Sequence, residues 1–247
     1  MSWIEANSRR VRRDIVASPM YSFSVTRAFL VSYRPLCRTS AGKEAIQRYG
    51  LKPYVDGSCR REPDFEAALP TITCLCRGGL FAPRLRVGDR VAYISKQGVY
   101  SEGDAHWRLA ALLEVRRLFE SHVSAAAWFR QEGFSVPRNC MTGETAALPL
   151  HLTDGEIPTN LRRHRDRLSS EQIIRLWDNA YAARARAHPT VVVCATLFLN
   201  VQTPPKILRR DWLNWLGRVP ITRNPPQIEE KLWSLLMQRA CESNGSA

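Results

Sequence analysis

The chain has 247 residues, 45% of them hydrophobic and 24% charged, so it can bury a sizeable core, and a folded rather than a disordered chain is expected. Lysine and arginine number 36 against 23 acidic residues, which gives a formal net charge of +13. This excess points to a polyanionic partner such as nucleic acid, although a GC-rich genome would also enrich arginine codons.

The first half of the chain predicts a β-rich core behind a basic leader. Apolar or aromatic residues alternate with polar ones from Tyr21 to Arg27, which predicts a half-buried strand. Helical character follows from Thr39 to Tyr49, and Gly50 is placed to end that helix. Leu69 to Arg77 predicts a further strand.

A hairpin is predicted near the middle of the chain. Gly88 and Asp89 predict a tight turn before a strand from Val91 to Ser95, and a polar hairpin tip runs from Lys96 to Asp104. Trp107 to Phe119 has the propensity of either a helix or a strand. We predict a strand, because the preceding strand needs a hairpin partner.

Three segments are predicted to be irregular. Tyr54–Glu66 is dense in turn-forming residues and in charges of both signs, and Arg77–Pro83 is a second loop. Pro137–Pro158 is a long connection with little periodicity, which suggests a lid, a binding loop or a domain linker.

The last third of the chain predicts helices around one strand. A helix from Ser121 to Gln131 precedes the long connection, and a capping-box pattern from Ser169 to Gln172 predicts the start of another. Val191–Leu199 is strongly apolar and predicts a fully buried strand. A short helix around Trp212–Leu216 and a terminal amphipathic helix over Ile228–Cys241 complete the chain.

These elements predict an α+β fold with four sections. They are a basic leader over 1–20, a β-rich core over 21–135, a long loop with a basic run over 136–168, and a helix–strand–helix extension over 169–247. The extension could complete the same domain as the core.

We expect a cytoplasmic, bacterial protein, and hydropathy and cysteine usage support the cytoplasmic location and the lack of a membrane partner. No apolar run reaches the ~20 residues of a membrane span, and Met1–Arg13 lacks the apolar segment of a secretory signal. Seven scattered cysteines are expected to be reduced thiols. Cys74 and Cys76, with Cys59, could ligate a metal, but strand alternation places the pair on one buried face, so we predict no metal site.

The hairpin resembles the PUA-like superfamily. In the EVE, ASCH and YTH members of that superfamily, a turn similar to Val87-Gly-Asp-Arg-Val91 precedes a core strand, and the next strand ends in a Glu-Val-like segment, as Leu109–Val115 does here. The pairing of Tyr21–Arg27 with Phe81–Pro83 also resembles nucleotide-modification-associated domains, which occur near DNA hypermodification genes. The likeness covers residues 21–119.

This resemblance implies a small curved β-barrel or sheet with flanking helices. It also implies a pocket for a modified or flipped base and basic residues that grip the nucleic-acid backbone. The aromatic cage of EVE and YTH proteins has no residue-by-residue match in this chain. The charged segment from Tyr54 to Glu66 departs from simple readers of modified bases, and this departure suggests an enzyme.

Carboxylates in that charged segment are the predicted catalytic groups. Hydrolysis at the sugar C1′ of a nucleotide needs a carboxylate beside the anomeric carbon and access to an unstacked base. Asp56, Glu62 and Asp64 are the candidates, and Asp56 is the first to test. The neighbouring Arg60 and Arg61 could hold phosphates and keep an acid ionised. Alternatively, Asp56 caps a turn and the arginines form ion pairs on a solvated loop.

Aromatic and basic side chains are the predicted nucleic-acid contacts. The aromatic candidates for base stacking are Tyr54, Phe81, Tyr100 and Trp107, although core packing is the favoured role for each of them taken alone. The basic candidates beside the PUA-like turn and hairpin are Arg84, Arg86 and Lys96, and those in the densest cationic run are Arg162, Arg163, Arg165 and Arg167. Each phosphate contact is expected to add about one unit to the slope of log K against log salt.

Other catalytic motifs are absent from the sequence. It contains no Walker loop, no GxGxxG after a strand, no HExxH, no GxSxG and no zinc-deaminase pattern, and no cofactor is predicted. Two functions remain. One is a DNA glycosylase-type enzyme that excises hypermodified bases in a phage-defence or DNA-modification context. The other is a non-catalytic PUA-like reader of modified DNA or RNA. We expect DNA rather than RNA as the partner, and a basic structural protein is a third possibility.

Overall fold

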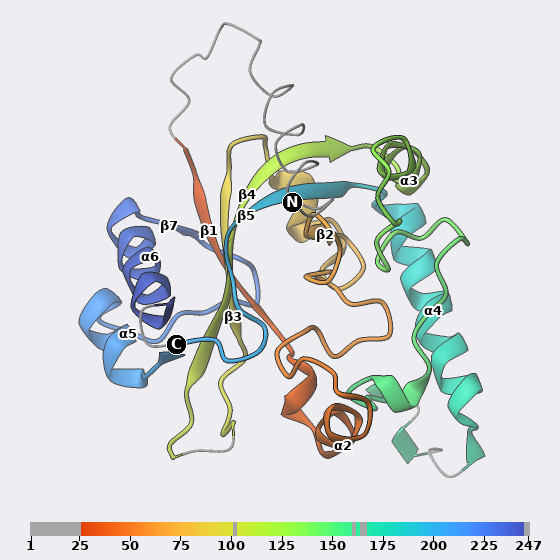
Figure 1. Cartoon of the computed structure of the whole chain (residues 1–247), viewed down its shortest axis with the longest axis horizontal. Helices are drawn as coiled ribbons and strands as arrows, with labels where there is room; N and C mark the ends of the chain where they lie inside the picture. The colour runs from red at the N-terminus through yellow and green to blue at the C-terminus, as the bar shows by residue number, and fades with distance from the viewer. Residues whose placement is uncertain (1–25, 101–102, 160–161, 164–166, 245–247) are drawn as a thin grey trace, which may run out of the picture.

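A computed structural model describes residues 26–100, 103–159, 162–163 and 167–244 (Figure 1). The protein is α+β, with one open, mixed sheet. Its strands are β1 (Ala28–Tyr33), β2 (Thr71–Thr73), β3 (Arg90–Ser95), β4 (Trp107–Phe119), β5 (Val191–Leu199), β6 (Lys206–Ile207) and β7 (Gln227–Ile228). Its α-helices are α2 (Ser40–Tyr49), α3 (His122–Gln131), α4 (Ser170–Ala187), α5 (Arg209–Leu216) and α6 (Glu230–Asn244).

The strand order is β2-β5-β4-β3-β1-β7, and β6 pairs with the start of β4. β1 and β3 run parallel, with Ala28 opposite Arg90 and Tyr33 opposite Ser95, whereas the other pairs are antiparallel. β5 lies between β2 and β4. Residues 169–247 therefore supply a central strand of the sheet as well as its flanking helices.

The two faces of the sheet follow from alternation along its strands. In β1, Phe29, Val31 and Tyr33 belong to one buried cluster, and Ala28 and Leu30 belong to another. The first cluster packs against irregular segments between β1 and β3, while the second packs against apolar residues of α5 and α6. Each face is therefore covered by a different part of the chain.

The helices are divided between these faces (Figure 1). α5 and α6 cover one side, and α2, α3 and α4 lie on the other. The segments around residues 54–70 and 137–158 lie between the sheet and α4, whereas Ala125 and Ala126 of α3 pack directly on Val191 of β5. α4 contacts these segments through Tyr181 and Ala185, which cluster with Cys59 and Leu75. This layer of irregular chain between sheet and helix forms the walls of the pocket described below.

Most local predictions are confirmed. The Thr39 side chain accepts a hydrogen bond from the backbone N–H of Gly42, and Gly50 ends α2 with φ 63°, a left-handed conformation that glycine adopts without strain. The capping box of Ser169 and Gln172 starts α4. β4 is a strand over the predicted Trp107–Phe119 range.

Three strand predictions need correction. The first strand begins at Ala28, whereas most of the predicted Tyr21–Arg27 strand lies outside the described residues, and its last two residues are not in a strand. β2 ends at Thr73, because the chain turns there; Cys74 is buried but Cys76 is exposed, so they do not share a buried face. β5 is fully buried only over its first four residues.

Candidate functional site

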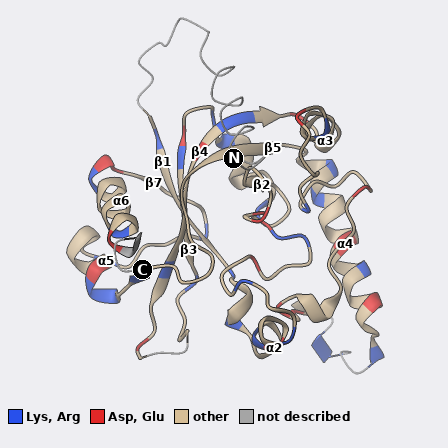
Figure 2. Ribbon diagram, in the orientation of Figure 1, with Lys and Arg blue, Asp and Glu red and all other residues tan. Residues whose placement is uncertain are grey.

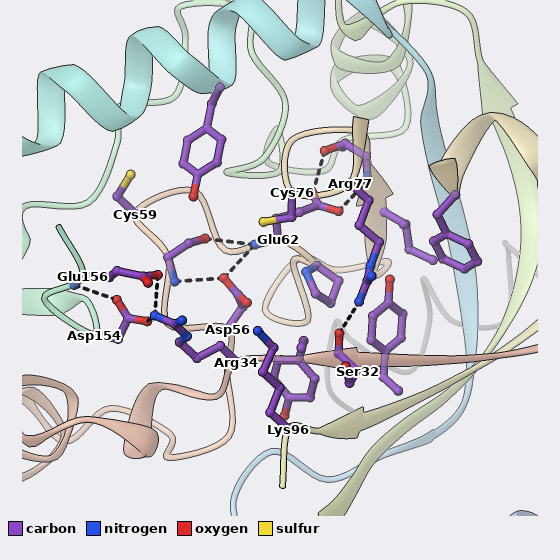
Figure 3. A pocket seen from close by; sticks show the side chains of 18 of the residues that line it. Ser32, Arg34, Asp56, Cys59, Glu62, Cys76, Arg77, Lys96, Asp154 and Glu156 are labelled. Atoms are coloured by element: carbon purple, nitrogen blue, oxygen red, sulfur yellow. Dashed lines mark hydrogen bonds and ion pairs between the residues drawn. The ribbon is translucent and has the colours of Figure 1, made fainter. Parts of the chain in front are cut away.

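A pocket of about 750 Å³ lies between the sheet and α4 (Figure 3). Its lining comes from the ends of β1 and β3, the segments around residues 56–63 and 150–156, and the inner side of α4. A volume of this size is in the range of small-molecule and cofactor sites and exceeds what a single nucleobase fills. The pocket is therefore the candidate functional site.

Asp56 reaches the pocket from the charged segment that the sequence singled out. Its Oδ1 accepts hydrogen bonds from the backbone N–H groups of Ser58 at 2.9 Å and Glu62 at 3.1 Å, so the carboxyl group caps the turn that it starts. Only 4% of the residue is exposed. Burial raises the pKa of Asp56 to about 7, against the opposing effect of its hydrogen bonds with Ser58.

Glu62 is a second buried acid on the pocket lining. Its Oε1 accepts a hydrogen bond from the backbone N–H of Thr73 at 2.8 Å. Its Oε2 accepts from the Thr73 hydroxyl at 2.6 Å and from Nδ2 of Asn139 at 2.8 Å. Burial raises the pKa of Glu62 to about 7, with a smaller contribution from the Asp56 charge. Two buried acids with pKa values raised to about 7 therefore line the same pocket.

Asp64, the third predicted catalytic acid, does not line this pocket. Its Oδ1 accepts from the backbone N–H groups of Glu66 and Ala67, and its Oδ2 accepts from the backbone N–H of Arg138. Its carboxylate fixes the end of the charged segment against the long connection. We therefore withdraw Asp64 as a catalytic candidate and assign it to the structure of the loop.

Arg60 and Arg61 are buried, contrary to the predicted phosphate contact. Arg60 Nε donates to Oδ1 of Asp178 at 2.6 Å and its Nη1 to the carbonyl of Thr145 at 2.7 Å. Arg61 donates to the carbonyls of Asp56 at 2.6 Å and Leu152 at 3.0 Å. With 4% and 2% of these residues exposed, their donors bind other parts of the fold rather than a ligand. The alternative prediction, that these arginines form ion pairs within the protein, agrees better with the structure. The loop that carries them is buried, however, and not solvated as that alternative assumed.

A second pair of acidic residues lines the pocket and was not predicted from the sequence. Asp154 and Glu156, from the long connection, flank Arg34, which follows β1 (Figure 3). Gly57 permits this arrangement, because a Cβ at its position would lie 2.8 Å from Cβ of Asp154. Burial raises the pKa of Asp154, with Arg34 opposing that rise. The length of the Pro137–Pro158 connection suggested a functional role for that segment, but no sequence motif identified Asp154 or Glu156.

Basic side chains border the same pocket. Arg77 donates to the carbonyls of Ser32, Thr222 and Arg223, and Arg184 donates to the carbonyl of Leu75 at 2.7 Å. Lys96 is the single predicted basic contact that lines the pocket, and burial lowers its pKa, helped by the charges of Arg34 and Arg38. Arg77 and Arg184 are thus held by backbone carbonyls, whereas Arg34 pairs with the acids Asp154 and Glu156.

Aromatic residues form part of the walls. Of the four predicted aromatic residues, Phe81 and Trp107 line the pocket and are buried. Tyr54 and Tyr100 do not line it and pack on each other, with their ring centroids 5.7 Å apart. The sequence missed Trp177 and Tyr181 on α4, whose rings stack with centroids 5.8 Å apart and an interplanar angle of 19°. Both lie on the side of α4 that lines the pocket.

Cys76 presents a thiol to the pocket (Figure 3). The surrounding protein raises the pKa of this thiol well above its usual value, and the charges of Asp56 and Glu62 raise it further. The thiol form is therefore favoured at neutral pH, which makes Cys76 a weak nucleophile. Among the described residues, no three His, Cys, Asp or Glu side chains are grouped so as to hold a metal ion.

The remaining predicted basic contacts are dispersed. Arg84, Arg86, Arg162, Arg163 and Arg167 are exposed and do not line the pocket, and Arg165 lies outside the described residues. Lysine and arginine positions occur on both sides of the sheet (Figure 2). Because Arg60 and Arg61 are buried, they do not form one basic surface with the exposed Arg84, Arg86, Arg162 and Arg163.

Comparisons with known proteins give no match: no protein-family model, no curated protein and no solved structure is similar to this chain. In the part of the chain that the structure describes, no helix is both long and apolar enough to cross a membrane.

Proposed function

We propose that the pocket binds a modified base turned out of DNA and that the protein cleaves the N-glycosidic bond of this base. The observation that carries the proposal is Asp56, a buried carboxyl group with a pKa raised to about 7 on the lining of a pocket with aromatic walls. Perturbed acids in pockets are frequent at catalytic sites. The protein would thus be a DNA glycosylase-type hydrolase.

The two acids support a balanced hydrolysis. Water attacks C1′ as the C1′–N bond breaks, and ionised Asp56 accepts the proton of that water and stabilises the positive charge on the sugar. The electron pair of the broken bond leaves with the base, which takes a proton from the neutral form of Glu62. Asp56 and Glu62 with pKa values near 7 provide both forms at neutral pH.

The rest of the pocket suits an extruded base. Trp177 and Tyr181 offer aromatic surface for stacking, which is worth ~1 to 3 kcal/mol per base. The guanidinium groups of Arg77 and Arg184, fixed by backbone carbonyls, can stabilise negative charge on the departing base. The volume of about 750 Å³ leaves room for a bulky substituent on the base.

The PUA-like resemblance adds to the proposal. We propose that the curvature of such folds is present here, because the register shifts in β4 at Leu112/Leu113 and Val115/Arg117 are the irregularities that bend a strand. A PUA-like protein whose pocket combines aromatic walls with buried acids fits a modified-base ligand. Phage defence or DNA modification is the matching biological context.

A non-catalytic reader is the second candidate. The observation in its favour is the tight hydrogen bonding of Glu62, whose oxygens already accept from Thr73 and Asn139. A carboxyl group held in this way can recognise donors on a base edge without reacting. A reader would bind modified DNA or RNA and leave it intact.

The decisive test compares the wild-type protein with Asp56→Asn on duplex DNA that carries a bulky modified base. We expect the wild type to release the base and leave abasic sites, and Asp56→Asn to lose at least about 100-fold in rate while still binding. Released base is measured by liquid chromatography. Asp104→Asn, an exposed residue away from the pocket, is the matched control and should keep its activity.

Three outcomes separate the candidates. Base release that depends on Asp56 supports the glycosylase. Preferential binding of modified DNA with no release at enzyme excess overturns the glycosylase in favour of the reader. No preference for modified over plain nucleic acid at two salt concentrations overturns both.

A further inference from the structure

Two segments that meet at one side of the pocket carry features that the proposed chemistry does not use. We call them the rim segments, residues 77–86 and 218–224. Leu80, Thr222 and Arg223 from these segments line the pocket. Arg77 donates to the carbonyls of Thr222 and Arg223, so the two segments are held together at the pocket.

A second set of hydrogen bonds fixes the outer part of the rim. Arg84 Nη1 donates to the carbonyl of Leu80 at 3.3 Å and to Oδ1 of Asn224 at 3.1 Å. The backbone at Leu80 is therefore tied to the opposite segment through one guanidinium group. This bracing gives the rim a defined shape without help from a regular element.

Each rim segment exposes a large apolar side chain. Leu80 is 58% exposed while lining the pocket, and Ile221, next to Thr222, is 74% exposed. With more than half of its surface exposed, Leu80 adds little to the buried core, and it is not one of the two acids of the proposed chemistry. Apolar side chains in this position are used by DNA-binding proteins as wedges between base steps.

The charge of the rim fits a polyanion. Neither segment contains an acidic residue, and together they contain Arg77, Arg84, Arg86, Arg218 and Arg223. Arg86, Arg218 and Arg223 are exposed, and none of them forms an ion pair with another described residue. The phosphates that flank an extruded base would meet these side chains first.

We infer that the rim segments dock on a nucleic-acid duplex and that Leu80 enters the space left by the base that moves into the pocket. The inference rests on the proposed function and deepens it by naming the substrate class, a base within a duplex rather than a free nucleotide or a single strand. Ile221 packs on the neighbouring base pair from the opposite segment. Unstacking a base costs a few kcal/mol, which the inserted side chain partly offsets.

The test compares Leu80→Ala with the wild type on one modified base in two settings, a duplex and the matching single strand. In both, 2-aminopurine next to the modified base reports extrusion by an increase in fluorescence, and base release is measured in parallel. We expect Leu80→Ala to lose about tenfold or more in extrusion and release on the duplex and less than about threefold on the single strand.

Leu213→Ala is the matched control, because Leu213 is 43% exposed on α5, which covers the other side of the sheet. It should behave as the wild type on both substrates. Since Leu80 and Leu213 are exposed, both variants are expected to fold.

The outcomes distinguish the inference from the function on which it rests. Equal losses on duplex and single strand, or no loss on the duplex, overturn the wedge even if bases are released. Extrusion that depends on Leu80 without base release keeps the wedge and overturns the glycosylase. If the wild type neither binds the duplex nor raises the fluorescence, the rim does not serve DNA, and a protein partner for its apolar side chains becomes the better explanation.

Discussion

Asp56 is a residue whose ionisation opposes folding. Its pKa is raised from the usual 3.8 to about 7 by burial, so between these values the unfolded chain releases a proton that the folded protein retains. The free energy of unfolding therefore falls as the pH rises from about 4 to about 7. Below this window the carboxyl group is neutral in both states and the penalty disappears.

An Asp56→Asn variant should escape that penalty. The asparagine Oδ1 can still accept from the N–H groups of Ser58 and Glu62, but it carries no charge. We expect stability equal to the wild type near pH 4 and higher by about 1 to 3 kcal/mol above pH 7. Urea unfolding at pH 5 and pH 8 measures the difference, and a variant less stable than the wild type at pH 8 would contradict it.

The sequence predicted part of the site for reasons that the structure revises. Asp56 and Glu62 were selected because acids lay among arginines, yet burial rather than arginine contact dominates their pKa values. Arg34, Asp154 and Trp177 were missed, because they converge through tertiary contacts of segments far apart in the chain. Local sequence patterns do not indicate which distant segments come together in the fold.

At the scale of elements, α4 forms one wall of the pocket and is held there by a few polar contacts. Arg60 joins it to the rest through Asp178, and Trp177 Nε1 donates to the carbonyl of Glu156 at 2.8 Å. Arg184 adds a bond to the carbonyl of Leu75. Because Arg60 also bonds the carbonyl of Thr145, it links α4, the charged segment and the long connection.

Replacing Arg60 with alanine should therefore loosen this whole wall. We expect a loss of about 2 to 4 kcal/mol in the free energy of unfolding, because Asp178 and the carbonyl groups of Arg138 and Thr145 lose a common donor. Arg186→Ala, an exposed position on the same helix, should change it by less than about 0.5 kcal/mol. Denaturant unfolding tests both. Similar effects of the two variants would show that Arg60 does not hold α4.

The bounds of the helices were predicted from the sequence more accurately than those of the strands β1 and β2. α2, α3 and α4 begin and end at local signals such as the Thr39 cap, Gly50 and the capping box at Ser169. The predicted bounds of β1 and β2 were wrong, because the ends of a strand depend on the strands with which it pairs. β1 pairs with β3 and β7. β2 pairs with β5, which lies more than 100 residues further along the chain. The periodicity of apolar residues does not indicate which distant strands will pair.

At the scale of the whole molecule, the first half of the chain is incomplete without the last third. β5 lies between β2 and β4, and residues of α6 such as Leu232, Trp233 and Leu236 bury one face of the sheet. A fragment of residues 21–135 would leave β2 without its strand partner and that face uncovered.

We therefore expect the 21–135 fragment to remain unfolded or aggregate, and the full chain to unfold in one cooperative transition. Circular dichroism and amide-proton dispersion in nuclear magnetic resonance spectra measure both. A well-dispersed spectrum of the fragment would contradict the expectation and identify residues 21–135 as an independent domain.

The edge of the sheet beside β1 has a consequence for self-association. β7 covers only Ala28 and Phe29; beyond it, Leu30 donates to the carbonyl of Pro226, and the carbonyl of Ser32 accepts from Arg77. Proline offers no N–H to an incoming strand, and a guanidinium group occupies a position that a strand of another molecule would need. The same arginine that joins the rim segments thus hinders the addition of a strand at this edge of β1, and the net charge of +13 adds electrostatic repulsion between molecules.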